Sequence, residues 1–200
     1  MGETVLVGNG AALLGSDLGP AIDAHERIVR FNRYHLLGHE RDVGSRVTVW
    51  AVGVWRGALA VLQAQGAPPG SDTVDQVWAA TVAGRSARNT PEWREYSEFL
   101  PQPYSAVAVT YELLGIPLVR ELKAAGCIAA LRWPSTGLLM LAYCLRARPD
   151  EVPAVCGFWG RPGIYANPGG CAPGREHDFS LERVLIETWI KEGRVWVCGA

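Results

Sequence analysis

Short apolar runs that end in turn residues recur along the chain and predict buried strands. An unbroken apolar run of about four to eight residues is typical of a strand covered on both faces, as in a parallel α/β sheet. The first run leads directly into Gly8-Asn9-Gly10, and a strand followed by a glycine turn is a common beginning of such a sheet. We therefore expect an α/β fold. The predicted strands are residues 4–7, 27–31, 47–52, 151–158 and 195–197.

Apolar residues at helical spacing predict helices between these strands. In the last one Asp178 is the predicted N-cap and Gly193 the terminator, which leaves His177 just outside the helix, free to face a cleft. Its predicted apolar face consists of Leu181, Val184, Leu185, Ile186, Thr188 and Trp189. The other predicted helices are residues 21–24, 55–65 and 118–125, together with the apolar stretch that Pro134-Ser135-Thr136-Gly137 opens.

Three segments lack a regular pattern. Residues 41–46 form a predicted polar turn, and residues 160–174 form a loop rich in glycine and proline. Residues 74–104 contain an apolar piece at 77–82 and then a polar, aromatic part. A lid, a surface that faces a ligand and an ordinary surface excursion all fit this last segment.

Composition narrows the class of protein. The length of 200 residues fits one domain, 1–200, and 48% hydrophobic with 20% charged residues excludes wholesale disorder. A net charge of −1 argues against a nucleic-acid partner. The longest apolar run, 138–145, is too short to span a bilayer, and no cationic region opens a signal peptide. Taken as a whole chain, the sequence predicts a soluble, cytoplasmic protein without a membrane segment.

Five scattered cysteines, without a C-x-x-C pair, indicate neither a zinc site nor a disulfide framework. Cys127, Cys144 and Cys156 lie among apolar residues and are predicted to be small buried side chains.

The opening of the apolar helix at Ser135, Thr136 and Gly137 is a candidate anion site. The first backbone N–H groups of a helix lack partners within it, and the helix dipole adds positive charge there. Small side chains let a phosphate approach these groups closely. Serine and threonine also cap helices in ordinary structural roles, so both interpretations stay open.

Two predicted strands deliver an asparagine at their carboxyl ends, Asn9 and Asn32. Their amides could grip a phosphate, a ribose or a base, or could merely hold a turn. The sequence does not carry the dinucleotide fingerprint. No third glycine follows Gly8 and Gly10 at the required spacing, and Asn32 stands where an acidic residue should end the second strand. We therefore do not expect a nicotinamide enzyme.

Three separated segments carry motifs that occur in a fixed order. The first comprises residues 7–10, 15–16, 22–25, 30–32 and 42–46, and the second comprises 134–140, 150–152 and 157–158. The third is a histidine and a glutamate with four residues between them, His177 and Glu182. In order and spacing, along about half of the chain, these segments resemble the long, short and very short motifs of the animal-type sialyltransferase family (glycosyltransferase family 29).

The resemblance implies a Rossmann-like three-layer sandwich with a mostly parallel central sheet, of the glycosyltransferase type A variant. It also implies a CMP-sugar donor, with an acidic sugar, and an unknown acceptor. His177 would be the general base that deprotonates the acceptor hydroxyl. The residues implied to bind the donor are Gly8, Asn9, Gly10, Asn32, Ser135, Thr136, Gly137, Gly157 and Glu182.

The chain departs from the family pattern at several positions. Thr4 and Pro149 stand where the family has a disulfide, which suits a reducing compartment, and Ala12 replaces a second asparagine. No histidine occurs near residues 163–165, where the family has one that assists the leaving group.

The implied transfer needs few protein groups. A helix start stabilises the departing phosphate, and an imidazole, which titrates near neutral pH, can serve as base for an inverting displacement. The sequence has no Asp-x-Asp metal-binding element, so we expect a reaction without a metal or other cofactor. Two alternatives remain: a hydrolase of a CMP-sugar or CMP conjugate, and a CMP-binding module without catalysis.

Overall fold

The computed structural model describes residues 3–54, 56–81, 91–99, 105–110, 117–118, 120–121, 134–159, 177 and 179–199. The strands of these ranges form one sheet in the order β5-β4-β3-β2-β1-β6-β7, and every pairing is parallel. The predicted parallel α/β fold is therefore confirmed. The strands are β1 (Thr4–Val7), β2 (Arg27–Phe31), β3 (Val49–Gly53), β4 (Gln76–Thr81), β5 (Ser105–Thr110), β6 (Ala154–Cys156) and β7 (Trp196–Val197).

Alternating side chains of the strands enter two separate cores, one on each face of the sheet. In β1, Val5 and Val7 enter the first core and Leu6 the second. In β4, Val77 and Ala79 enter the first core, whereas Trp78 and Ala80 enter the second. Because successive side chains of a strand point to opposite faces, continuous apolar runs are what a doubly covered sheet requires.

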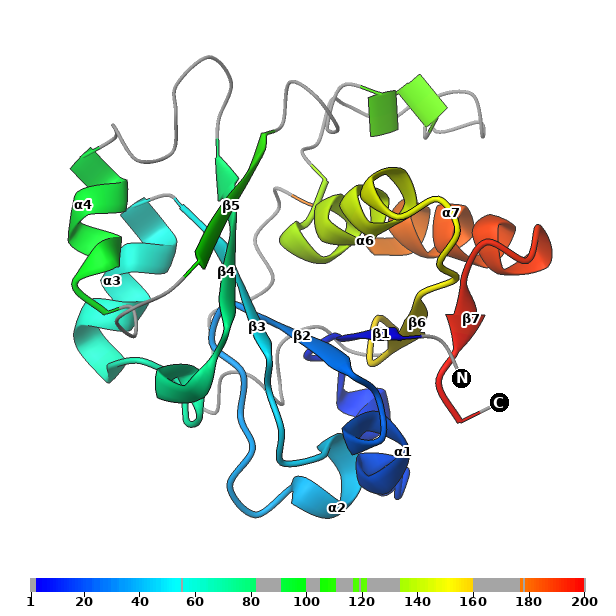
Figure 1. The fold of residues 1–200 in the computed structure, drawn as a ribbon, viewed down its shortest axis with the longest axis horizontal. Helices are drawn as coiled ribbons and strands as arrows, with labels where there is room; N and C mark the ends of the chain where they lie inside the picture. Colours follow the sequence, from blue (N-terminus) through cyan, green and yellow to red (C-terminus); the bar gives the residue numbers. More distant parts are fainter. Residues whose placement is uncertain are drawn as a thin grey trace.

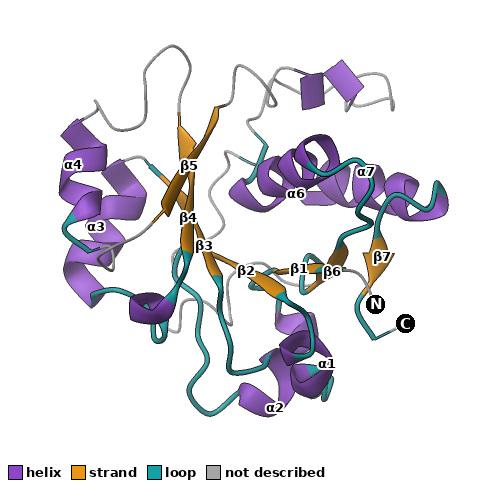
Figure 2. Cartoon of the chain, in the orientation of Figure 1, coloured by secondary structure: helices purple, strands orange, loops and turns teal. Residues whose placement is uncertain are grey.

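Helices cover both faces and complete a three-layer sandwich (Figure 1). The first core includes side chains of α1 (Gly19–Asp23), α2 (Glu40–Val43) and α3 (Arg56–Gln65). The second includes side chains of α6 (Thr136–Ala147) and α7 (Phe179–Lys191). Figure 2 shows α4 (Pro91–Ser97) beside α3, at the β4–β5 end of the sheet.

Three expectations are wrong in the described ranges. The apolar piece of 74–104 is β4, a strand between β3 and β5 whose Val77 and Ala80 are fully buried, so this part is neither a lid nor a surface excursion. Residues 41–46 are not all turn, because α2 extends to Val43. Val184 and Thr188 do not belong to the buried face of α7, since the Val184 side chain is 45% exposed and Thr188 is exposed as well. Asp178 and residues 160–174 lie outside the described residues, as do parts of 74–104 and 118–125.

Polar side chains fix the loops around the first three strands. Asp42 Oδ2 and Oδ1 accept from the amides of Gly15 (2.8 Å) and Asp17 (3.0 Å), and these hydrogen bonds lower the pKa of the carboxyl. Arg30 is buried and donates to the carbonyls of Arg46 (2.8 Å) and Val43 (2.6 Å). These motif residues therefore have a structural role in shaping the turns.

The position of the missing family disulfide is occupied by polar contacts. Thr4 is fully buried, and its hydroxyl accepts from Arg27 Nη1 at 2.9 Å. The same nitrogen lies 3.7 Å from Glu151 Oε2, which also pairs with Arg148 Nη1 at 3.4 Å. Arg27 therefore links β1 and β2 to the segment that follows α6.

No helix within the described ranges is long and apolar enough to cross a bilayer.

Candidate functional site

The strand order reverses between β1 and β6, because β2 to β5 extend from one side of β1 while β6 and β7 lie on the other. In open α/β sheets ligands bind outside the carboxyl ends of the strands at such a point. Gly8, Asn9 and Gly10 follow β1 and Gly157 follows β6, so four of the predicted binding residues lie at this position.

The three glycines let two loops approach each other closely. Gly8 N donates to Cys156 O and Gly10 N to Gly157 O, both at 2.8 Å. A Cβ atom on Gly8 would lie 2.3 Å from Gly157 O, and one on Gly10 2.4 Å from Trp159 O. Gly157 has a φ of +66°, which favours glycine. All three positions therefore require glycine, because other protein atoms occupy the space that a Cβ atom would need.

The two asparagines connect neighbouring strands. Asn9 Nδ2 donates to Phe31 O at 3.2 Å, at the end of β2. Asn32 Oδ1 accepts from the amide of Gly53 at 2.9 Å, at the end of β3. Asn32 has a φ of +48°, a conformation that asparagine tolerates well. Each side chain is half-buried and bridges to the next strand, a role different from holding its own turn.

Phe158, which the sequence analysis included in the short motif without a binding role, joins the strand ends to α6. Its ring lies edge-on to Phe31, with 5.7 Å between the ring centroids. A Cβ atom on Gly137 would lie 3.1 Å from Phe158 Cε1, so this first-turn glycine packs under the ring. The signal available in the sequence was an aromatic residue directly after a strand-end glycine. Its contact partners, Phe31 and Gly137, are far from Phe158 in the sequence, so no local pattern predicts these contacts.

Ser135 is the N-cap of α6, as one of the two interpretations predicted. Its Oγ accepts from the amide of Leu138 at 3.2 Å. The same hydroxyl donates to Glu182 Oε2 at 2.5 Å, and the Ser135 amide donates to Glu182 Oε1 at 2.7 Å. Glu182 lies in the first turn of α7 and is 5% exposed. A buried carboxylate thus fixes the openings of the two helices together.

The carboxylate of Glu182 changes the anion site that the sequence predicted. Its negative charge faces the positive end of the α6 dipole and repels a second anion nearby. The amides of Thr136 and Gly137 remain as first-turn donors without an acceptor in their own helix. These two groups, rather than the Ser135 amide, are therefore the backbone donors left at this helix start.

His177 precedes α7 by two residues and is half-buried. Its ring centroid lies 5.7 Å from that of Phe179. Because Glu182 in the first turn of α7 contacts Ser135, His177 belongs to the end of α7 that meets the start of α6. No three His, Cys, Asp or Glu side chains of the described residues converge in a way that could hold a metal ion.

Comparison with known proteins supports the resemblance. Residues 2–60 match the family model "Glycosyltransferase family 29 (sialyltransferase)". The type 2 lactosamine alpha-2,3-sialyltransferase of Mus musculus is 48% identical over 44 residues, which cover 22% of this chain and 13% of that protein. A second Mus musculus protein, CMP-N-acetylneuraminate-beta-1,4-galactoside alpha-2,3-sialyltransferase, is 27% identical over 175 residues, or 77% of this chain.

The chain spans 43% of the length of this second relative. The fold is similar to the crystal structure of a mammalian sialyltransferase in complex with Gal-beta-1-3GalNAc-ortho-nitrophenol, with a TM-score of 0.62 and 19% sequence identity. That match covers 97% of this chain and 68% of the other. The expected Rossmann-like glycosyltransferase fold is therefore confirmed. Residues 2–60 match the model of glycosyltransferase family 29, the sialyltransferase family, and the fold is similar to that of a mammalian sialyltransferase, so this chain is similar to that family in its N-terminal sequence and in its fold.

Proposed function

We propose that this chain is a glycosyltransferase that moves an acidic sugar from a CMP-sugar to an acceptor hydroxyl. The observation that carries the proposal is one chain of contacts among residues from distant segments. Asn9 holds the end of β2, Phe158 joins β2 to the start of α6, and Ser135 joins α6 to α7 through Glu182. These contacts connect the carboxyl ends of β1, β2 and β6 with the starts of α6 and α7, near the point where the strand order reverses, and so support the proposal.

The proposed donor site uses backbone and amide groups. The amides of Thr136 and Gly137 would donate to the phosphate of CMP and stabilise the charge that it gains on leaving. Asn9 and Asn32 each use one polar side-chain atom to hold a strand, and the other atom of each amide would contact the nucleotide. The name of the second mouse relative contains CMP-N-acetylneuraminate, which supports the choice of an acidic CMP-sugar.

His177 is the proposed general base. It would accept the proton of the acceptor hydroxyl while the oxygen attacks the anomeric carbon from the face opposite the departing CMP. Attack from that face inverts the configuration of the sugar, and no metal is needed in this scheme. Glu182 would act indirectly, because both of its oxygens hold Ser135 and it joins the helix next to His177 to the phosphate-binding turn.

The first test is binding. CMP at about 100 times its dissociation constant should stabilise the protein by about 2.7 kcal/mol, which corresponds to a rise in Tm of roughly 5–10 °C. UMP and AMP at the same concentration serve as controls for a site that recognises cytosine. Absence of any shift with CMP would contradict the proposal at its foundation.

The second test is turnover with the His177→Ala variant. We expect it to bind CMP like the parent protein while transfer from CMP-N-acetylneuraminate falls by at least about 100-fold. His39→Ala is the matched control, since His39 directly precedes α2 and lies outside the proposed site. Release of free sugar without an acceptor would identify a hydrolase. A protein that binds CMP but turns over no CMP-sugar would be a binding module.

A further inference from the structure

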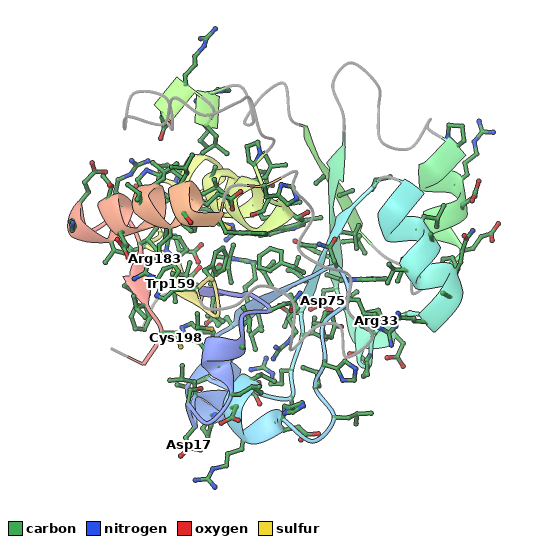
Figure 3. The ribbon with its side chains drawn as sticks, turned by 180° about the vertical axis from the view of Figure 1, so that it is seen from behind. Asp17, Arg33, Asp75, Trp159, Arg183 and Cys198 are labelled. Atoms are coloured by element: carbon green, nitrogen blue, oxygen red, sulfur yellow. The ribbon has the colours of Figure 1, made fainter. Side chains whose placement is uncertain are left out.

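Cys156 and Cys198 occupy neighbouring positions on two paired strands. Ala154 pairs with Trp196 and Val155 with Val197 in the parallel register of β6 and β7, so the next step of that register aligns Cys156 with Cys198. The amide of Cys198 donates to Val155 O at 3.0 Å, which continues the pairing beyond β7. Figure 3 labels Cys198 at the end of this edge strand.

Both thiols are free, and both point into the same core. Cys156 is 5% and Cys198 is 2% exposed, and the two thiols are close enough for each to shift the pKa of the other. Aligned residues on neighbouring strands have Cα atoms about 5 Å apart, which is within the range of about 4.4–6.8 Å that disulfides span. The backbone spacing at these two positions therefore suits a disulfide.

The electrostatic environment distinguishes the two thiols. The hydrogen bond to Cys198, followed by burial, raises the pKa of Cys156. The same hydrogen bond lowers the pKa of Cys198, because it stabilises the thiolate. Cys198 is thus the better nucleophile of the pair. It also lies on a two-residue edge strand with one neighbour, and short edge elements open locally more readily than central strands.

We propose that Cys156 and Cys198 are a redox-active dithiol that forms a reversible disulfide across β6 and β7. The oxidant is a small-molecule disulfide, such as oxidised glutathione. The Cys198 thiolate attacks one sulfur of the oxidant, forms a mixed disulfide and releases one thiolate. Cys156, after losing its proton, attacks the Cys198 sulfur and releases the second thiolate. The protein thereby loses two electrons and two protons, and the oxidant becomes two thiols.

The pair lies beside the candidate site but does not depend on its function. The carbonyl of Cys156 accepts from Gly8 N, and the next residue is Gly157. A disulfide at Cys156 therefore anchors the strand that carries one of the two packed loops, whatever that site binds.

The test is disulfide mapping of the full chain. The reduced protein is incubated with excess oxidised glutathione, its remaining thiols are alkylated, and its peptides are analysed by mass spectrometry. We expect a crosslinked peptide pair containing Cys156 and Cys198, and a Tm of the oxidised protein about 5 °C or more above that of the reduced protein. Both results should reverse on addition of dithiothreitol.

Matched variants keep the result interpretable. Cys144→Ala should leave both the crosslink and the Tm rise intact, because Cys144 lies in the opposite core, where burial raises its pKa to about 12. Cys198→Ala and Cys156→Ala should each lose both. A stable glutathione adduct on Cys198 without the crosslink would overturn the proposal. So would crosslinking of either cysteine to Cys127 or Cys171 in its place.

Discussion

The two oxygens of the Glu182 carboxylate accept from the amide and the hydroxyl of Ser135, which lies 47 positions away in the sequence. On α7, Glu182 shares its buried face with Leu185, Ile186 and Trp189. A charged residue in that position is normally costly, and here both oxygens have hydrogen-bond donors. At a position on the buried face of α7 where an apolar side chain would make only non-directional contacts, the carboxylate makes directional hydrogen bonds that connect the starts of two helices.

Replacement of Glu182 tests this role at the level of one side chain. Glu182→Ala leaves the Ser135 amide without its acceptor and should lower the free energy of unfolding by about 2–4 kcal/mol, measured by denaturant titration. Glu187→Ala removes an acid from the same helix, but its pair with Arg183 (2.7 Å) is exposed, so the loss should be under about 0.5 kcal/mol. Equal losses of unfolding free energy in the two variants would argue against a special stabilising role of the buried contact between Glu182 and Ser135.

At the scale of elements, the segments after β1 and β6 pack backbone against backbone. Gly8 and Gly10 face Gly157, and the side of each glycine that a Cβ would occupy is filled by protein atoms. Glycine patterns at strand ends are often interpreted as ligand cradles. In this protein the same glycines are required for close packing of the two loops that follow β1 and β6. A nucleotide bound as proposed would contact the surface that these loops form.

Alanine substitutions separate the contribution of contact from that of backbone strain. Gly157 and Gly193 both have positive φ values, +66° and +71°. A Cβ atom on Gly157 would lie 2.5 Å from Leu13 Cδ1 and 2.6 Å from Gly8 O. A Cβ atom on Gly193 would lie in open space. Gly193→Ala should therefore cost about 1–2 kcal/mol of unfolding free energy.

Gly157→Ala should cost about 1–3 kcal/mol more than Gly193→Ala, since it adds overpacking to the same strain. Thermal or chemical denaturation of the two variants in parallel gives the difference. If the two losses were the same, the close approach of the loops after β1 and β6 would not be an important constraint on this fold.

At the scale of the whole molecule, β4 extends the sheet beyond β3 and pairs with β5. Trp78 of β4 is 2% exposed, and its ring contacts Tyr143 of α6 with 5.1 Å between centroids. The apolar piece of the segment that had no regular pattern in the sequence is therefore part of the central layer. Its weak signal has a physical cause: a short strand with tryptophan, alanine and a glutamine at its start resembles a surface segment when its neighbours are unknown.

Trp78→Ala tests whether this part of the chain belongs to the core. Removal of the buried indole should lower the free energy of unfolding by about 3–5 kcal/mol. Trp196→Ala, at the half-buried edge strand β7, should cost less. A change within about 0.5 kcal/mol for Trp78→Ala would instead suit a surface lid. Global unfolding monitored by circular dichroism distinguishes these results.

Local patterns were sufficient for much of the architecture. The bounds of β1 follow from an apolar run, those of β2 from a short segment that ends at Asn32, and Ser135 was recognisable as a cap from its place before an apolar helix. Cys144 and Cys156 are buried as predicted. The cytoplasmic location, the single-domain boundary and the binding roles of the site residues stay predictions.

By itself, the sequence determined the type and order of the elements it specified locally, because periodicity, turn chemistry and caps depend on residues a few positions apart. It also indicated the resemblance to the sialyltransferase family, through motifs matched in order. Only the tertiary structure decided which distant groups meet: Glu182 with Ser135, Phe158 with Gly137, and Cys156 with Cys198. Such contacts depend on the order of strands in the sheet and on how helices cross it, and no local pattern of residues encodes either.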